Sequence, residues 1–233
     1  MSISNAEIKL VRALREKKFR DEYGQFVVEG EKMVQEALKS DFDVLKVWRK
    51  EEIGEEAMKR ISSFSTPSPV LALIKRPESS EPVLEKGLYL ALDSVRDPGN
   101  LGTIIRIADW FGINTLFASP DSVEPWNPKV IQASMGSIFR VRFAYADIPG
   151  LCRRFRDAGM NVYGTFLDGD DIYSLPLDKD GLIVMGNESN GISDAVGAEV
   201  NARLFIPSYG NSGAESLNVA VATAVTLAEF RRR

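Results

Sequence analysis

Five polar side chains in three short stretches could bind and orient a ligand, namely Asn100, Arg106, Glu188, Ser216 and Asn218. Amide and hydroxyl groups hold polar substrates in place, a carboxylate accepts hydrogen bonds, and a guanidinium binds phosphate in a bidentate way. The chain contains no histidine and only one cysteine. This inventory excludes a Ser-His-Asp triad, a histidine-bound zinc and a multi-cysteine metal site, and we expect no metal.

The first stretch has the sequence DPGNLGTIIR at residues 97–106 and joins an expected strand to an expected helix. The free N–H groups at the start of such a helix attract anions. Arg106 follows Asn100 by about one and a half helical turns and could project beside it. The stretch is neither a GxGxxG motif nor a Walker loop, so a phosphate-binding turn of a nucleotide-binding enzyme is a weaker interpretation. A surface pair of Arg106 with Asp109 is a further alternative.

The other two stretches also follow expected strands. MGNES at residues 185–189 ends an apolar run, and Gly186 lets a ligand approach the backbone closely. ESLN at 215–218 precedes small apolar residues from 219 to 227, which predicts a buried helix with Ser216 as its N-cap. The alternatives are a polar turn for the former and an N-capped core helix without a ligand for the latter.

Strands alternate with helices beyond residue 87, which predicts a mostly parallel sheet covered by helices on both faces. Ligands of such sheets bind beyond the carboxyl ends of the strands, where we expect the three stretches to meet. A smaller α/β unit precedes this sheet, and the polar segment 76–82 with its two prolines is the candidate linker. We expect strands at 26–30, 44–48, 69–74, 88–95, 114–118, 140–144, 162–167, 182–185 and 203–207. We expect helices at 31–40, 55–63, 101–111, 129–138 and 147–158, and a last helix that follows its N-cap Ser216.

Residues 5–20 predict an amphipathic helix with a basic outer face. Its basic residues are Lys9, Arg12, Arg15, Lys17, Lys18 and Arg20. Two acidic residues oppose them, so the segment carries +4 and the rest of the chain −8, within a net charge of −4. Such a face suits contact with phosphates, whereas the alternative is a solvated surface helix. Because no apolar run reaches the length of a membrane span and the start lacks a signal-peptide pattern, we expect a cytoplasmic protein without a membrane.

Taken together, the three stretches resemble the three motifs of the SpoU/TrmH family over roughly residues 88–230. Members of this family are S-adenosylmethionine-dependent RNA ribose 2′-O-methyltransferases. The segments 17–20 and 26–32 resemble the RNA substrate-binding domain of two-domain members, a small ribosomal-protein-like α/β unit. The resemblance implies an N-terminal domain at 1–76, a linker at 77–86 and a catalytic domain at 87–233 with a deep trefoil knot. It also implies a homodimer through the knotted domain.

The resemblance further implies roles for individual residues. The substrate side comprises Asn100, Arg106, Glu188, Ser216 and Asn218, with Arg106 either activating the 2′-hydroxyl or clamping a phosphate. S-adenosylmethionine would be held by Thr165, Phe166, Leu167, Gly186, Asn187, Ile206, Pro207, Ser216 and Leu217, and the basic face of residues 9–20 would contact RNA. The expected substrate is ribosomal RNA. Transfer RNA, a base methyltransferase of a related knotted family and a non-catalytic RNA-binding module are the alternatives.

Overall fold

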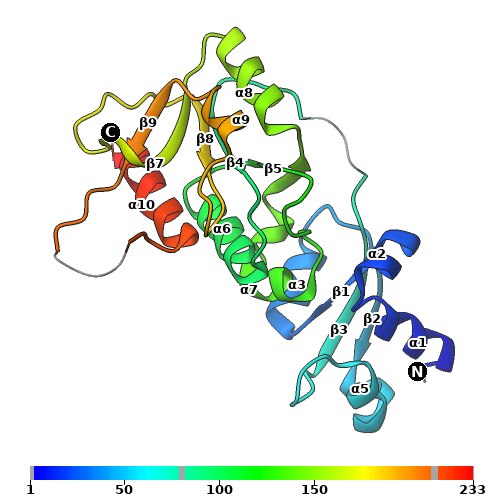
Figure 1. Cartoon of the computed structure of the whole chain (residues 1–233). Helices are drawn as coiled ribbons and strands as arrows, with labels where there is room; N and C mark the ends of the chain where they lie inside the picture. Colours follow the sequence, from blue (N-terminus) through cyan, green and yellow to red (C-terminus); the bar gives the residue numbers. More distant parts are fainter. Residues whose placement is uncertain (1–2, 79–81, 211–214, 233) are drawn as a thin grey trace.

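The computed structural model describes residues 3–78, 82–210 and 215–232, and these contain two β-sheets (Figure 1). The smaller sheet is antiparallel, in the order β1-β3-β2. Together with its helices we call it the N-terminal unit; its elements are α1 (Asn5–Ala13), α2 (Lys17–Tyr23), β1 (Gln25–Glu29), α3 (Glu31–Leu38), β2 (Val44–Arg49), α4 (Lys50–Ile53), α5 (Glu55–Ile61) and β3 (Val70–Lys75). The central strand β3 is buried on both faces, which explains its continuous apolar sequence.

The basic segment forms two helices and not the single helix that we expected. α1 begins with a capping box, in which the Ser4 hydroxyl accepts from the Glu7 N–H and the Glu7 carboxylate accepts from the Ser4 N–H. It ends before Leu14, which is buried among the side chains of the N-terminal unit. α2 then starts at Lys17, so the chain turns between the two helices.

The larger sheet has six parallel strands in the order β6-β5-β4-β8-β7-β9, which confirms the expected parallel architecture. We call this sheet with its helices the C-terminal unit. Its strands are β4 (Leu88–Leu92), β5 (Thr115–Ala118), β6 (Arg142–Tyr145), β7 (Val162–Asp171), β8 (Gly181–Met185) and β9 (Ala202–Phe205). The central strands β4 and β8 are buried along their whole length.

Helices cover both faces of this sheet, as expected. One face packs against α6 (Pro98–Trp110), α7 (Pro128–Ser134) and α10 (Val219–Arg232), and the other against α8 (Ile148–Asp157) and α9 (Asp194–Gly197). Alternate residues of β4 serve the two faces: Leu90 points into the first cluster and Ala91 into the second. Among the described residues, no helix is both long enough and apolar enough to span a bilayer.

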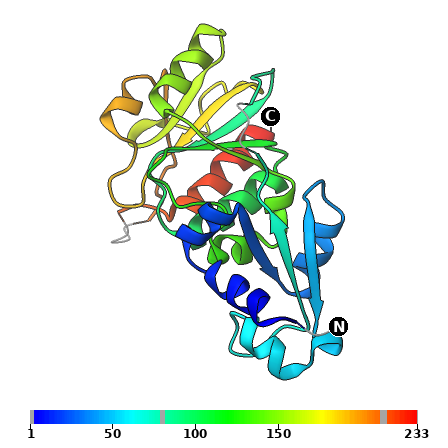
Figure 2. The same cartoon turned by 90° about the vertical axis from the view of Figure 1, so that its right-hand side faces the viewer.

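The two units share one apolar core instead of being joined only by a linker (Figure 1 and Figure 2). Phe26 of β1 packs against Trp126, which lies after β5, with ring centroids 4.7 Å apart. Two ion pairs cross the same seam, Arg20 with Glu124 and Glu36 with Arg140. The N-terminal unit is therefore docked against the segment between β5 and β6, which carries Glu124, Trp126 and Arg140.

Some elements differ from the expected ones. The helix expected at 129–138 stops at Ser134, because Met135 and Gly136 adopt positive φ angles of 53° and 99°, and a 3-10 turn follows at Ser137–Phe139. The short helices α4 and α9 were not expected. The trefoil knot stays a prediction, and residues 211–214 of the connection before α10 lie outside the described residues.

Candidate functional site

The three polar stretches follow β4, β8 and β9 of the large sheet. β4 pairs with β8, and their last residues, Leu92 and Met185, are opposite each other. β9 lies two strands beyond β8 and leads towards α10. Since all these strands are parallel, the loops that follow them leave the sheet at the same edge.

Three of the five candidate side chains form one hydrogen-bonded chain. The Asn100 amide nitrogen donates to Glu188 Oε1 at 3.0 Å, and the Asn218 amide nitrogen donates to Asn100 Oδ1 at 2.9 Å. These partners are 88 and 118 residues apart in sequence. The prediction that Asn100, Glu188 and Asn218 come together is therefore confirmed.

Helix caps position the Asn100 backbone and the Asn218 side chain. Asp97 is the N-cap of α6 and accepts from the Asn100 N–H at 2.7 Å, with Pro98 as the first helical residue. Asn218 caps α10, because its Oδ1 accepts from the N–H groups of Ala220 and Val221 at 2.9 and 3.3 Å. Each asparagine thus lies at a helix start, and both amide atoms of each side chain form hydrogen bonds within the protein.

The prediction of Ser216 as the N-cap of the last helix was wrong. α10 begins at Val219, so the side chain directly before its first turn is that of Asn218. Ser216 lies two residues earlier and is exposed. An N-cap oxygen must reach the second or third N–H of the helix, which a residue further upstream does not do.

The second stretch is a compact loop that Asn187 holds together. Asn187 Oδ1 accepts from the N–H groups of Ser189 and Asn190, and its amide nitrogen donates to the Ser94 carbonyl at 2.7 Å. A Cβ on Gly186 would lie 2.2 Å from the Gly191 carbonyl carbon. The glycine is therefore required because the loop folds back on itself, a reason that differs from the ligand approach we expected.

Arg106 lies on the outer face of α6 and is exposed. Arg106 comes six positions after Asn100, which places it about 9 Å further along the helix axis. It forms no hydrogen bond or ion pair with any residue that the structure describes. The alternative partner, Asp109, accepts instead from Arg140 and from the Ser137 hydroxyl. The Arg106 guanidinium is thus available to an external anion, but it takes no part in the hydrogen bonds that join Asn218, Asn100 and Glu188.

The residues expected to hold a cofactor lie within β7, directly after β8 and β9, and before α10. Thr165 and Asp170 of β7 both pair with Leu204 of β9, so residues 166–169 bulge out of the sheet. The bulge carries Phe166, whose ring stacks on the Arg203 guanidinium at 3.5 Å, and Leu167, which is 70% exposed. Ile206 and Pro207 follow β9 directly. Leu217, also exposed, lies just before α10.

Comparison with known proteins gives the family of the chain. The family model described as SpoU rRNA Methylase matches residues 87–228, which is more than half of the chain. The chain belongs to the SpoU rRNA methylase family. A second family model, the MRM3-like substrate binding domain, matches residues 5–63 of the N-terminal unit.

Relatives share both units of this SpoU-family protein. The 23S rRNA (guanosine(2553)-2′-O)-methyltransferase RlmP of Bacillus subtilis is 31% identical over 246 residues, which cover 99% of this chain and 98% of RlmP. A Porphyromonas gingivalis structure described as a TrmH-family RNA methyltransferase is 40% identical, with a TM-score of 0.90 over 100% of this chain and 99% of the other. The AdoMet-bound rRNA methyltransferase of Sinorhizobium meliloti is 33% identical, with a TM-score of 0.89 over 100% and 96% of the two chains.

The SpoU-family site also contains a hydrogen-bond network that sequence reasoning missed. Asp121, after β5, accepts from the Ser94 hydroxyl at 2.7 Å, from the Ser119 hydroxyl at 2.7 Å and from Arg96 at 2.8 Å. The hydrogen bond from Arg96, followed by those of the two serines, holds the pKa of Asp121 well below its usual range. The network fixes Ser94, which has a φ of 61° and whose carbonyl holds Asn187.

No sequence motif marks Asp121, because two of its three partners, Ser94 and Arg96, come from a different loop. The only local signal is a run of polar residues after an apolar strand, which is common in loops. Ser94 at positive φ is an unusual conformation for a residue other than glycine. Its backbone angle is visible only in the folded structure.

The basic face of the SpoU-family N-terminal unit is partly available for RNA. Lys9, Arg12, Lys17 and Lys18 are exposed, although Lys17 forms an ion pair with Asp21 at 2.5 Å. The Arg15 guanidinium donates to the carbonyl groups of residues 61 and 62, at 3.2 and 2.5 Å, and keeps only part of its donors free.

Arg20 was wrongly included among the RNA-contacting residues. Its side chain is buried, donates to Glu124 across the seam and donates to the Leu14 carbonyl at 2.7 Å. A guanidinium enclosed in this way cannot reach a phosphate at the surface. Arg20 holds the two units together instead.

Proposed function

We propose that this protein methylates a ribose 2′-hydroxyl of ribosomal RNA. As a member of the SpoU rRNA methylase family, it is an S-adenosylmethionine-dependent RNA ribose 2′-O-methyltransferase. The observation that carries the proposal is the chain Asn218–Asn100–Glu188, which brings all three family motifs to one edge of the sheet. Ribosomal RNA is favoured over transfer RNA because RlmP and RlmB, two relatives, are named as 23S rRNA methyltransferases.

The residues expected to hold the cofactor fit such a molecule. Exposed apolar side chains at Leu167 and Leu217 can cover a flat adenine ring, and the strand ends at Gly186 and Ile206 offer main-chain groups at the same edge. When bound, S-adenosylmethionine supplies an electrophilic methyl group on a sulfonium. The protein must orient the ribose hydroxyl and stabilise the charge that develops on its oxygen.

Asn100, Asn218 and Glu188 supply the orienting groups. The Asn218 amide caps α10, and the Asn100 amide is held between Asn218 and Glu188, so the site is organised before the substrate arrives. Arg106 acts as a clamp for the phosphate next to the target ribose and stabilises the developing alkoxide. We favour the clamp over a base because a guanidinium stays protonated in proteins.

We test the role of Arg106 by replacing it with alanine. Removal of one such donor typically lowers kcat by about 100- to 1000-fold, and we expect a loss of this size with the S-adenosylmethionine Kd unchanged. Calorimetry measures Kd, and transfer of a labelled methyl group measures kcat. The control is Arg156→Ala, which removes an exposed arginine on the opposite face of the sheet. Cofactor binding lost in step with activity would contradict the clamp.

We further propose that the protein works as a homodimer through the C-terminal unit. Trp110 is 85% exposed at the end of α6, and Val221 on the neighbouring α10 is half exposed. Aromatic side chains such as that of Trp110 are enriched at protein–protein interfaces. We expect the Trp110→Asp variant to sediment as a monomer and the parent protein to sediment as a dimer.

The division into an RNA-binding domain at 1–76, a linker at 77–86 and a catalytic domain at 87–233 is part of the same proposal. It is supported by the two family models, which match 5–63 and 87–228. Lys9, Arg12, Lys17 and Lys18 would supply phosphate contacts. We place the activity in the cytoplasm, where bacterial ribosomal RNA is made and assembled.

The substrate class is tested by methyl transfer to separate pools of ribosomal and transfer RNA that have not been modified. Alkaline hydrolysis of the labelled product leaves a resistant dinucleotide where a ribose is methylated, because the 2′-oxygen can no longer attack the phosphate. We expect resistant label in 23S rRNA only. Label in transfer RNA alone would refute the ribosomal substrate, and label released as mononucleotides would indicate base methylation.

A further inference from the structure

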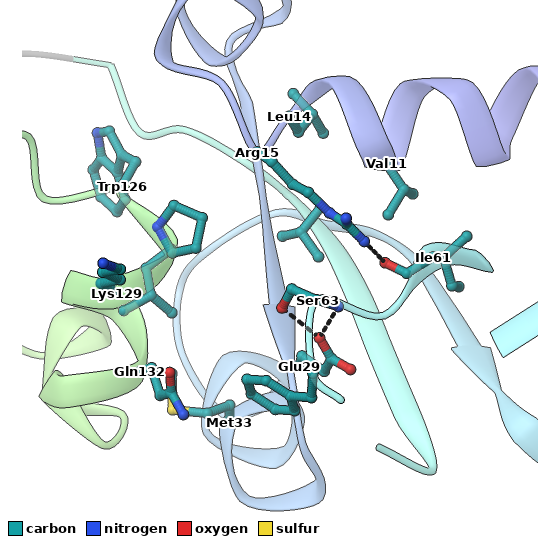
Figure 3. A pocket seen from close by; sticks show the side chains of 14 residues that line it. Val11, Leu14, Arg15, Glu29, Met33, Ile61, Ser63, Trp126, Lys129 and Gln132 are labelled. Atoms are coloured by element: carbon teal, nitrogen blue, oxygen red, sulfur yellow. Dashed lines mark hydrogen bonds between the residues drawn. The ribbon is translucent and has the colours of Figure 1, made fainter. Parts of the chain in front are cut away.

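A cavity of about 320 Å³ lies in the seam between the two units, away from the Asn100 site. Figure 3 shows its two walls: Trp126, Lys129 and Gln132 come from the C-terminal unit, and Arg15, Glu29 and Ser63 from the N-terminal unit. Its volume falls at the lower end of the range of ligand pockets, about 300–1,000 Å³, and suits one nucleoside-sized group.

The lining combines aromatic and apolar walls with a cationic and amide rim. Phe64 and Trp126 are the aromatic residues, and Phe64 is 36% exposed. The side chains of Lys129 and Gln132 make no hydrogen bond or ion pair with any residue that the structure describes. Aromatic side chains beside cations are the surroundings that unstacked nucleobases and their phosphates occupy on RNA-binding proteins.

Opposite the amide rim, the other wall is held in shape by its own hydrogen bonds. Glu29 accepts from the N–H and hydroxyl groups of Ser63, at 2.9 and 2.8 Å, and these bonds fix the segment that follows α5. Arg15 is anchored through one nitrogen to two carbonyl groups of the same segment. Across the seam, Phe26 packs on Trp126. The cavity is therefore built into the fold and does not depend on a closing motion.

Helix α7 connects the cavity with α6, the helix that carries Asn100. Trp126 and Lys129 follow β5 at the edge of the sheet where Asn100 follows β4. α7, which carries Lys129 and Gln132, packs directly against α6, since a Cβ on Gly102 would lie 2.5 Å from the Val130 carbonyl. On the other side, α1 extends from the cavity with its basic face.

We propose that the seam cavity takes one unstacked nucleobase of the RNA substrate, from a nucleotide near the methylated one. Phe64 stacks on the base, the Gln132 amide bonds its polar edge, and Lys129 binds its phosphate. This proposal rests on the proposed function and names a subsite of it. It would make both units read the same RNA strand, one for the target ribose and one for a neighbouring base.

The test compares Gln132→Trp, which fills the cavity, and Phe64→Ala, which removes the stacking surface, with the matched control Gln35→Trp on the exposed side of α3. The assay is methyl transfer to a 23S rRNA transcript, with KM for the transcript and kcat measured separately, and Kd for the same transcript by filter binding. Loss of one stacked base weakens binding by about tenfold or more. We expect this increase in KM and Kd for both cavity variants, with kcat and the S-adenosylmethionine Kd unchanged.

A photo-crosslinking residue at position 132 provides a second readout. We expect a crosslink to a defined nucleotide of the transcript, lost in the presence of Phe64→Ala. Unchanged RNA affinity of the cavity variants, or a crosslink to a ribosomal protein only, would overturn the proposal. If the parent protein binds the transcript but transfers no methyl group to ribose, the proposed function fails while the binding data still decide on the cavity.

Discussion

The buried ion pair between Arg20 and Glu124 makes the strongest stability prediction. Their side chains are 3% and 6% exposed, and the Arg20 Nε donates to Glu124 Oε1 at 3.1 Å. Glu124→Gln removes the negative charge and leaves the arginine charge enclosed between the two units. Breaking a buried pair in this way costs about 3–5 kcal/mol. Because Glu124 Oε2 has no partner among the described residues, the pair is incompletely satisfied and we expect about 3 kcal/mol.

Urea unfolding followed by tryptophan fluorescence measures this loss, since Trp126 lies at the seam. The two units share a core, so we expect one transition for both. The double variant Arg20→Met with Glu124→Met removes both charges together, and we expect it to unfold within about 1 kcal/mol of the parent protein.

The reasoning is refuted if Glu124→Gln costs less than about 1 kcal/mol, or if the double variant is as unstable as the sum of the two single variants. RNA binding supplies an independent check. Because Arg20 does not reach the surface, the folded double variant should keep the RNA affinity of the parent protein, with the same dependence on salt.

Three further predictions concern other parts of the molecule. Gly102→Ala should lower the free energy of unfolding in urea by about 1–3 kcal/mol and reduce methyl transfer. The reason is that the Cβ of the new alanine would meet backbone atoms of α7. An unchanged stability would show that α6 can shift freely. Lys17→Ala with Lys18→Ala should make the slope of log K for RNA against log salt shallower by about 1.4–1.8, and an unchanged slope would remove both side chains from the interface. Burial, followed by the charge of Glu199, raises the pKa of the Cys152 thiol to about 12. The folded state thus keeps the thiol proton more tightly than the unfolded state, so the stability that the protonated Cys152 contributes is lost as pH rises from about 9 towards 12. At pH 8, a thiol reagent should react with Cys152 only at the rate of unfolding.

Much of the architecture could be predicted because it depends on local patterns. The apolar runs of β4 and β8 are typical of strands buried on both faces, and their alternation with helices predicted the parallel sheet. The turn at Pro98 and the polar residues before α10 marked two loops at the right edge. The convergence of Asn100, Glu188 and Asn218 followed from that edge.

The remaining features depend on partners that are distant in sequence. Arg20 looked like one of six basic surface residues, and only its contact with Glu124, 104 residues away, shows that it is buried. Ser216 fits the pattern of an N-cap in sequence, but α10 starts at Val219 and Asn218 caps it. Asp121 accepts a hydrogen bond from Ser94, which belongs to a neighbouring loop.

The sequence by itself determined the order of the main strands and helices of the large sheet and which polar side chains follow them, because hydrophobic periodicity and turn residues act over a few positions. The tertiary structure alone decided which charges are enclosed, which asparagine caps the last helix and where the seam leaves a cavity. These outcomes depend on packing between segments that no local pattern relates, and burial sets the energy of each charged or polar group once that packing is complete.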